Sequence, residues 1–223
     1  MFAKWRSRPL RVDRSERPSH SPHVRSRRHC QRSPNQAMTP FARIRTQFAA
    51  NWTTVFVGWK GLGAFSPWPA HSAEFPPLLS VKELGDYANE RIRLSTETAE
   101  DELILRLSSL DLPSERRETI IAKLAQLSEW CRGDPSHELR KWRAVLLEDV
   151  LADLPRDPLS GMLALTEFWQ GFGYPSDSPH LVQGKGNTVS PADYYREDNY
   201  ERVVACHRAW LSREKAELQE DRE

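Results

Sequence analysis

The histidines and cysteines are the side chains with which this chain could bind a metal ion or act as a nucleophile. A zinc site needs closely spaced pairs, such as two cysteines separated by two residues or two histidines one helical turn apart. No two cysteines of the chain are closer than 75 residues, and no two histidines are four residues apart. The sequence therefore predicts no metal site and no cofactor.

Nucleophilic catalysis is not indicated either. Cys206 and His207 are neighbours, and adjacent helical residues point about 100° apart, so the imidazole cannot activate the thiol. We expect Cys131 and Cys206 to be small, buried apolar residues. Ser160 lacks the strand–turn–helix context of a nucleophile elbow. The glycine-rich segments 58–63 and 184–186 lack the spacing of a phosphate-binding loop, so both are interpreted as turns.

Paired carboxylates, the usual groups for acid–base catalysis, occur at Glu148–Asp149, at Glu197–Asp198 and over 100–102. Such a pair becomes catalytic when its environment separates the two pKa values, as an apolar pocket does. The sequence indicates no such pocket. We therefore expect solvated charge on helix faces and no catalytic residue.

Composition limits the elements that can position these residues. The chain has 223 residues, of which 39% are hydrophobic, and this suffices for one domain with a proper core. It has no run of about 18 apolar residues that could span a membrane. Its three cysteines do not make a complete disulfide framework. These properties predict a soluble, cytoplasmic protein.

Residues 1–37 differ in charge from the rest of the chain. They hold ten basic and two acidic residues, a net charge of +8, whereas residues 38–223 hold 22 basic and 29 acidic residues, a net charge of −7. Because this Arg/Ser/Pro-rich segment has few large apolar residues, we expect a disordered tail. Four interpretations stay open: a solvated tail, translation that starts at Met38, a nucleic-acid-binding arm, and a transit peptide, against which the prolines argue.

From residue 38 onward, apolar residues recur every three or four positions, which is the spacing of amphipathic helices. The pattern over 40–62 predicts one helix, with a short strand over 52–57 as the alternative. The last helix is expected to fray over the charged residues 214–223. The helices after residue 62 are expected to begin near Thr98, near Pro113, and at four capping signals: Ser80 with Glu83, Asp134–Pro135, Asp157–Pro158 and Ser190–Pro191.

These elements predict an all-α fold, in which about six amphipathic helices form a compact bundle over residues 38–223 behind the disordered tail. Short links between consecutive helices would also suit a solenoid. The sequence has no fixed repeat period, so the bundle is favoured.

Eight tryptophans are many for a chain of this length. Trp68 lies between two prolines, outside any helical stripe, and is a candidate for an exposed anchor of a protein partner. Packing of its loop onto the bundle is the alternative. Six others lie on or beside helical stripes and are expected in the core: Trp52, Trp59, Trp130, Trp142, Trp169 and Trp210.

A second candidate partner-binding region follows the long loop over 174–189. Tyrosines interleaved with acidic residues favour recognition of a basic protein, and an ordinary solvated helix face is the alternative. The candidate residues are Tyr174, Asp193, Tyr194, Tyr195, Glu197 and Asp198.

Three stretches occur in a familiar order: Trp-Thr-Thr-Val-Phe-Val-Gly-Trp-Lys over 52–60, Leu-Ser-Val-Lys-Glu-Leu-Gly-Asp-Tyr-Ala over 79–88, and Gly-Phe-Gly-Tyr-Pro over 171–175. Over about 52–215 the chain resembles a family of small, all-helical bacterial proteins of unknown function. The resemblance implies an association with polymorphic toxin loci, where an immunity protein blocks a cognate toxin. It implies no catalytic residues.

The function expected from these observations is non-catalytic binding of a protein partner, such as inhibition of a basic toxin through an acidic helical surface. Two alternatives stay open. One is an enzyme whose site is assembled from residues distant in sequence, and the other is a nucleic-acid binder that acts through residues 1–37.

Overall fold

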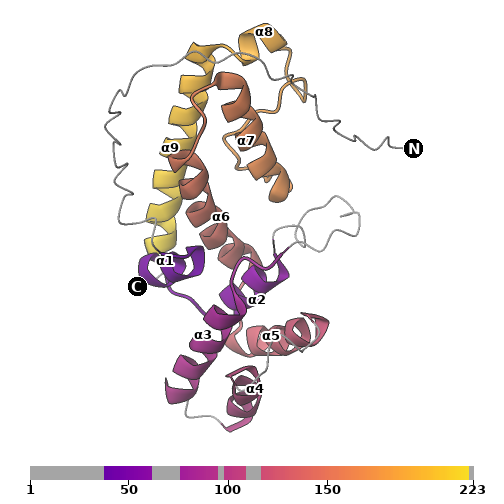
Figure 1. Ribbon diagram of the computed structural model, residues 1–223, viewed down its shortest axis with the longest axis vertical. Helices are drawn as coiled ribbons and strands as arrows, with labels where there is room; N and C mark the ends of the chain where they lie inside the picture. Colours follow the sequence, from indigo (N-terminus) through magenta and orange to yellow (C-terminus); the bar gives the residue numbers. More distant parts are fainter. Residues whose placement is uncertain (1–37, 62–75, 95–97, 109–116, 221–223) are drawn as a thin grey trace, which may run out of the picture. The chain divides into compact units, whose positions relative to one another are not determined.

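The computed structural model describes residues 38–61, 76–94, 98–108 and 117–220, and within these ranges the chain forms helices and no strand (Figure 1). The predicted all-α fold is therefore confirmed, and the strand alternative over 52–57 is wrong. The tail 1–37, Trp68 and Pro113 lie outside the described residues. The helices are α1 (Pro40–Gln47), α2 (Trp52–Lys60), α3 (Val81–Leu94), α4 (Thr98–Ser108), α5 (Arg117–Cys131), α6 (Pro135–Ala152), α7 (Pro158–Gly171), α8 (Pro191–Tyr194) and α9 (Glu197–Glu220).

Several helix starts follow the capping signals of the sequence. The Ser80 amide donates to Glu83 Oε2 (2.7 Å) and Ser80 Oγ accepts from the Glu83 amide (3.2 Å), which is the predicted capping box. The side chains of Asp134, Asp157 and Ser190 each accept a hydrogen bond from a backbone amide in the first turn of the following helix. Local side-chain chemistry thus determines where α3, α6, α7 and α8 begin.

The single helix predicted over 40–62 is wrong, because α1 ends at Gln47 and α2 begins at Trp52. Asn51 causes the break. Its side chain accepts from the Thr54 amide (2.9 Å), while Thr54 Oγ1 accepts from the Asn51 amide (2.9 Å). Asparagine competes with helical hydrogen bonding in this way, so it favours the N-cap over a helix interior. The described ranges contain more helices than predicted, because of this break and because α8 is a separate short helix.

Helix α6 is at the centre of the core (Figure 1). It packs on α1, α2, α7 and α9, while α2 also packs on α5 and α3 packs on α4. The Trp142 indole donates to the Thr54 carbonyl (2.9 Å), which ties α6 to α2. The core positions predicted for five tryptophans are confirmed, with exposed fractions of at most 4%: Trp52, Trp59, Trp142, Trp169 and Trp210.

Trp130 does not lie in the core as predicted, since its exposed fraction is 50%. The buried face of α5 is set by Ile120, Leu124 and Leu127, and Trp130 lies roughly 90° from that face at 3.6 residues per turn. The predicted burial of Cys131 and Cys206 is also wrong, because both are exposed. Cys131 has the helical phase of the buried face, but it is the last residue of α5. Cys206 lies about 100° around α9 from buried His207.

Helix α9 does not fray at residue 214 as predicted. Glu214 is 5% exposed and accepts hydrogen bonds from Arg140 (2.9 Å) and Arg143 (3.0 Å) of α6. Arg143 also donates to Asp177 (2.6 Å). Burial alone would raise the pKa of Glu214, but these arginines outweigh that effect and hold its pKa below the usual value. Partners more than 70 residues away therefore keep this charged segment helical and packed.

A further buried arginine holds α1 to α6. Arg43 is 4% exposed and donates to Glu148 (3.3 Å), to Asp149 and to the Val145 carbonyl (3.3 Å). Glu148 also accepts from Lys215 of α9 (2.7 Å). The Glu148–Asp149 pair is thus not free solvated charge, as was expected. We define the α6 ion network as Arg43, Arg140, Arg143, Glu148, Asp149, Glu214 and Lys215, of which Arg43, Arg143 and Glu214 are buried.

Candidate functional site

The candidate residues around α8 come together where α8 meets α9, but they do not all face outward. Asp193, Glu197 and Asp198 are exposed, and Tyr195 is half-buried. Tyr194 is only 4% exposed, so its predicted position on the surface is wrong. The cap at Ser190 sets the phase of α8 and turns Tyr194 inward, where its hydroxyl donates to the Leu181 carbonyl (2.7 Å).

The candidate Tyr174 lies against α7. It is half-buried, its hydroxyl donates to the Thr166 carbonyl (3.4 Å), and the Lys185 ammonium lies 4.7 Å from the centre of its ring. Its backbone has a φ of 53°, an unusual left-handed conformation for a tyrosine, directly after Gly173 with a φ of 72°. Two consecutive left-handed residues end α7 sharply and turn the chain into the long loop.

Tyr195 is the aromatic side chain that the corner between α8 and α9 presents to solvent. Its ring packs edge-on against buried Tyr194, with centroids 4.9 Å apart and an interplanar angle of 87°. Its hydroxyl makes no hydrogen bond within the part of the chain that the structure describes. A tyrosine held by a buried neighbour loses little rotamer freedom on binding, and it offers both apolar area and a polar tip.

The charges of this corner are only partly compensated. Arg196 lies 3.9 Å from Asp193 and 3.2 Å from Asp198. Glu197 and Glu201 have no ion pair with any described residue, and both are exposed. We define the corner surface as Asp193, Tyr195, Glu197, Asp198 and Glu201.

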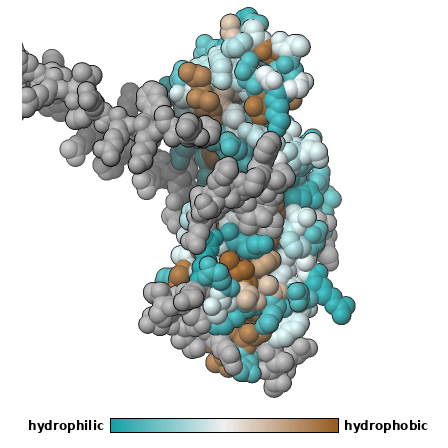
Figure 2. Space-filling view, turned by 90° about the vertical axis from the view of Figure 1, so that its right-hand side faces the viewer, coloured by the Kyte–Doolittle hydropathy of each residue, from teal (hydrophilic) through white to brown (hydrophobic). Residues whose placement is uncertain are grey.

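Several apolar residues of the described ranges are exposed. On the face that Figure 2 shows, brown hydrophobic patches are small and separated by hydrophilic residues. Leu159 and Leu163 of α7 are 48% and 46% exposed, and Leu181 and Val189 of the long loop are 63% and 41% exposed.

A pair of buried histidines lies beneath the long loop and was not found by sequence reasoning. His207 has no exposed surface, and its Nε2 accepts from the Trp169 indole (2.9 Å). Because an indole nitrogen only donates, the ring proton of His207 is on Nδ1, which lies 2.7 Å from the Val203 carbonyl. Burial lowers the pKa of His207. Both ring nitrogens are thus occupied, and the neutral ring is held in one tautomer.

His180 packs edge-on against His207, with ring centroids 5.5 Å apart. Its Nε2 lies 2.8 Å from Thr166 Oγ1, and that hydroxyl donates to the Met162 carbonyl (2.8 Å). The hydroxyl has one proton, so His180 must donate from Nε2, and its buried Nδ1 has no partner among the described residues. Burial, helped by the neighbouring His207, lowers the pKa of His180 to about 4.

The hydrogen bonds of the two histidines are made within the described part of the fold. His207 uses both nitrogens within the fold. In the described parts of the chain, no three His, Cys, Asp or Glu residues lie close enough together to hold a metal ion. None of the helices described there combines the length and hydropathy needed to cross a bilayer. The sequence signal that would have revealed the pair is weak, because the two histidines are 27 residues apart.

Of the comparisons with known proteins, only the one with family models found a match. No curated protein and no solved structure matches the chain. A family model described as "Uncharacterized protein conserved in bacteria (DUF2247)" matches residues 42–215. This region includes the three stretches on which the expected resemblance rests, and it confirms a bacterial family of unknown function. The chain belongs to this family.

Proposed function

We propose that this protein acts without catalysis, by binding a basic protein partner through the corner surface. The observation that carries the proposal is Tyr195, a partly exposed ring packed against buried Tyr194, whose hydroxyl has no hydrogen-bond partner among the described residues. Tyrosines in such positions are frequent hot spots of protein interfaces. The corner surface therefore combines a rigid aromatic anchor with charged neighbours.

The charge of the surface supports a basic partner. Glu197 and Glu201 are one helical turn apart on α9, exposed and without an ion pair among the described residues. A cationic partner would be attracted to them over about a Debye length, which raises the association rate at low salt. The net charge of −7 over residues 38–223 acts in the same direction.

The specific form of the proposal is an immunity-like inhibitor of a basic toxin. The toxin would be encoded next to this protein, and binding at the corner surface would block the toxin's own nucleic-acid or substrate site. This form follows from the expected association of the family with toxin loci and from the charge complementarity. It needs no catalytic residue on this chain.

The test is co-expression with the product of the adjacent gene, followed by calorimetry on the purified complex. We expect rescue of growth and a stable complex. Tyr195→Ala should weaken the complex by about 30-fold, because a hot spot contributes about 2 kcal/mol or more. Trp130→Ala is the matched control, since Trp130 is a half-exposed aromatic on α5, and it should leave the affinity unchanged.

The outcomes separate the parts of the proposal. No complex and no rescue would remove the immunity-like function. A complex that tolerates Tyr195→Ala but not Trp130→Ala would move the binding site from the corner surface to α5.

A further inference from the structure

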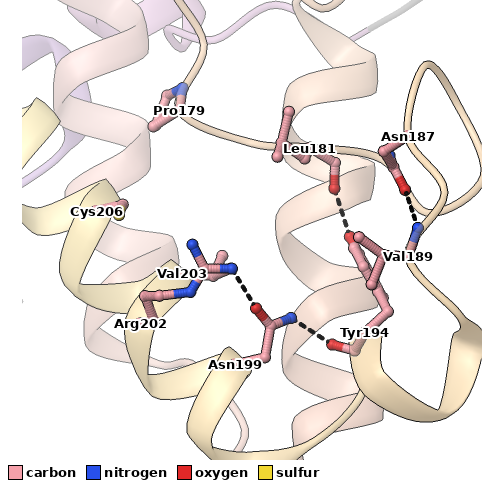
Figure 3. Close-up of a pocket in the computed structure, with 9 residues that line it drawn as sticks. All are labelled: Pro179, Leu181, Asn187, Val189, Tyr194, Asn199, Arg202, Val203 and Cys206. Carbon is pink, nitrogen blue, oxygen red and sulfur yellow. Dashed lines mark hydrogen bonds between the residues drawn. The ribbon is translucent and has the colours of Figure 1, made fainter.

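A small pocket lies between the long loop and the α8–α9 corner (Figure 3). Its apolar wall on the loop side is formed by Leu181 and Val189, and its wall on α9 by Val203 and Cys206. Its volume is about 60 Å³. The remaining lining residues are Pro179, Asn187, Tyr194, Asn199 and Arg202.

Hydrogen bonds hold the pocket open. The Tyr194 hydroxyl donates to the Leu181 carbonyl (2.7 Å), and Asn199 Nδ2 donates to the Tyr194 carbonyl (2.7 Å). Asn187 donates to the Val182 carbonyl (2.8 Å) and accepts from the Val189 amide (3.3 Å). Contact between the apolar side chains of the loop wall and the α9 wall would remove apolar area from water and close the pocket. The hydrogen bonds prevent this, because they hold the two walls apart. The pocket is therefore preformed, which lowers the cost of binding.

Arg202 gives the pocket a positive charge. One of its terminal nitrogens donates to Asn199 Oδ1 (2.6 Å). Within the described ranges it has no ion pair with a carboxylate. A guanidinium has five N–H donors in one plane and binds a carboxylate through two parallel hydrogen bonds. The amides of Asn187 and Asn199 are already engaged with the backbone, so Arg202 is the main polar group left for a ligand.

We propose that this pocket binds a small branched aliphatic group that carries a carboxylate. The apolar walls take the branched end, and Arg202 binds the carboxylate at the mouth. The volume limits the size, because it is roughly two-fifths of the 150 Å³ cavity that accepts benzene. An isopropyl group fits such a space. The inference does not depend on the proposed partner, because the pocket and the corner surface have no residue in common.

The test is an NMR titration of the full ¹⁵N-labelled chain with 3-methylbutanoate and, as the uncharged control, 3-methylbutanamide. The carboxylate should shift the amide signals of Leu181, Val189 and Val203 and should bind at least about 10-fold more tightly than the amide, because charge-assisted hydrogen bonds are the stronger ones. Equal binding of the two compounds, or no shift at these residues, would overturn the proposal. Titration with N-acetyl-Gly-Val distinguishes the source of the ligand: tighter binding than 3-methylbutanoate indicates the carboxyl end of a protein chain, and weaker binding a free acid.

Matched variants at two exposed cysteines test the apolar part. Cys206 lines the pocket, so Cys206→Phe should fill it and abolish the shifts. Cys131→Ser, at an exposed cysteine of α5 that does not line the pocket, should leave the carboxylate affinity unchanged. Arg202→Gln should weaken binding of the carboxylate at least about 10-fold without changing that of the amide.

A chemical measurement covers the case in which Cys206→Phe does not fold. Bound 3-methylbutanoate should slow alkylation of the Cys206 thiol by N-ethylmaleimide several-fold, as measured by peptide mass spectrometry. Cys131, the other free and exposed cysteine of the described residues, is the internal control and should react at the same rate with and without ligand. Equal protection of both thiols would contradict a specific site.

Discussion

The two ends of α9 contain acidic residues in opposite environments. Near the end of the helix, Glu214 is buried and paired with Arg140 and Arg143. At its start, Glu197 is exposed and has no ion pair with the described residues. Both belong to acidic stretches that look alike in the sequence. The comparison teaches that an acidic stretch is buried and packed where arginines of another helix pair with it, and stays exposed to solvent where no described arginine of another helix does.

The largest effect expected from this comparison is on stability at the buried end. Glu214→Gln removes the carboxylate that compensates two arginines, and breaking a buried ion pair from one side costs about 3–5 kcal/mol. Urea denaturation should show this loss of unfolding free energy. The control is Glu217→Gln, because Glu217 bonds to the same Arg140 (2.6 Å) from a half-exposed position. It should change stability by less than about 1 kcal/mol.

The next effect is the dependence of stability on pH, which distinguishes the histidine pair from the α6 ion network. The folded pKa of His180, about 4, lies below the unfolded value of 6.5, so the unfolded chain binds more protons between these values. Stability is therefore full above about pH 6.5 and falls as the pH decreases toward 4, by about 3 kcal/mol in total at 1.36 kcal/mol per pKa unit. Carboxylates such as Glu214, whose pKa is lowered, affect the pH dependence of the unfolding free energy only at the acidic end of this range.

Urea midpoints measured at pH 7.5, 6.5, 5.5 and 5.0 test this dependence. His180→Gln keeps a donor for Thr166 but does not titrate, so it should flatten the profile above pH 5. A wild-type profile that is flat from pH 7.5 to 5.0 would contradict the neutral, buried state of the pair.

A smaller effect is expected beneath the corner surface. A Cβ atom at Gly161 would lie 2.2 Å from the Tyr200 hydroxyl oxygen, which donates to the Pro155 carbonyl (2.6 Å). Gly161→Ala should displace Tyr200 at the start of α9 and cost about 1–3 kcal/mol. The matched control is Gly85→Ala in α3, where a Cβ meets nothing within 4 Å. It should stabilise the protein by about 0.5–1 kcal/mol, because glycine is a poor helix former. Thermal unfolding of the two variants measures both effects. Equal changes in melting temperature would contradict the tight packing of Tyr200 against Gly161.

The sequence predicted what depends on local chemistry. The capping box at Ser80 and the cap at Asp157 set their helix starts, and the periodicity placed Trp142 and Trp169 in the core. Prediction from the sequence failed where the structure of a segment depends on a partner far along the chain. Nothing near residue 214 indicates that arginines of α6 hold it.

The candidate site shows the same limit. Its exposed acids Asp193, Glu197 and Asp198 were predictable from charge alone. The division between buried Tyr194 and half-exposed Tyr195 was not, because it depends on the phase that the Ser190 cap gives to a four-residue helix. The pocket was not predictable either, since its loop wall and its α9 wall meet only in the fold.

The most direct test of the central claim is to measure stability and partner affinity on one Glu197→Lys protein. The account predicts an unfolding free energy within about 1 kcal/mol of wild type, since only the helix-dipole interaction of an exposed residue changes. It predicts an affinity for the product of the adjacent gene that is at least about 10-fold lower at low salt. Unchanged affinity, or a loss of stability as large as that of Glu214→Gln, would contradict the separation of the two acidic ends of α9.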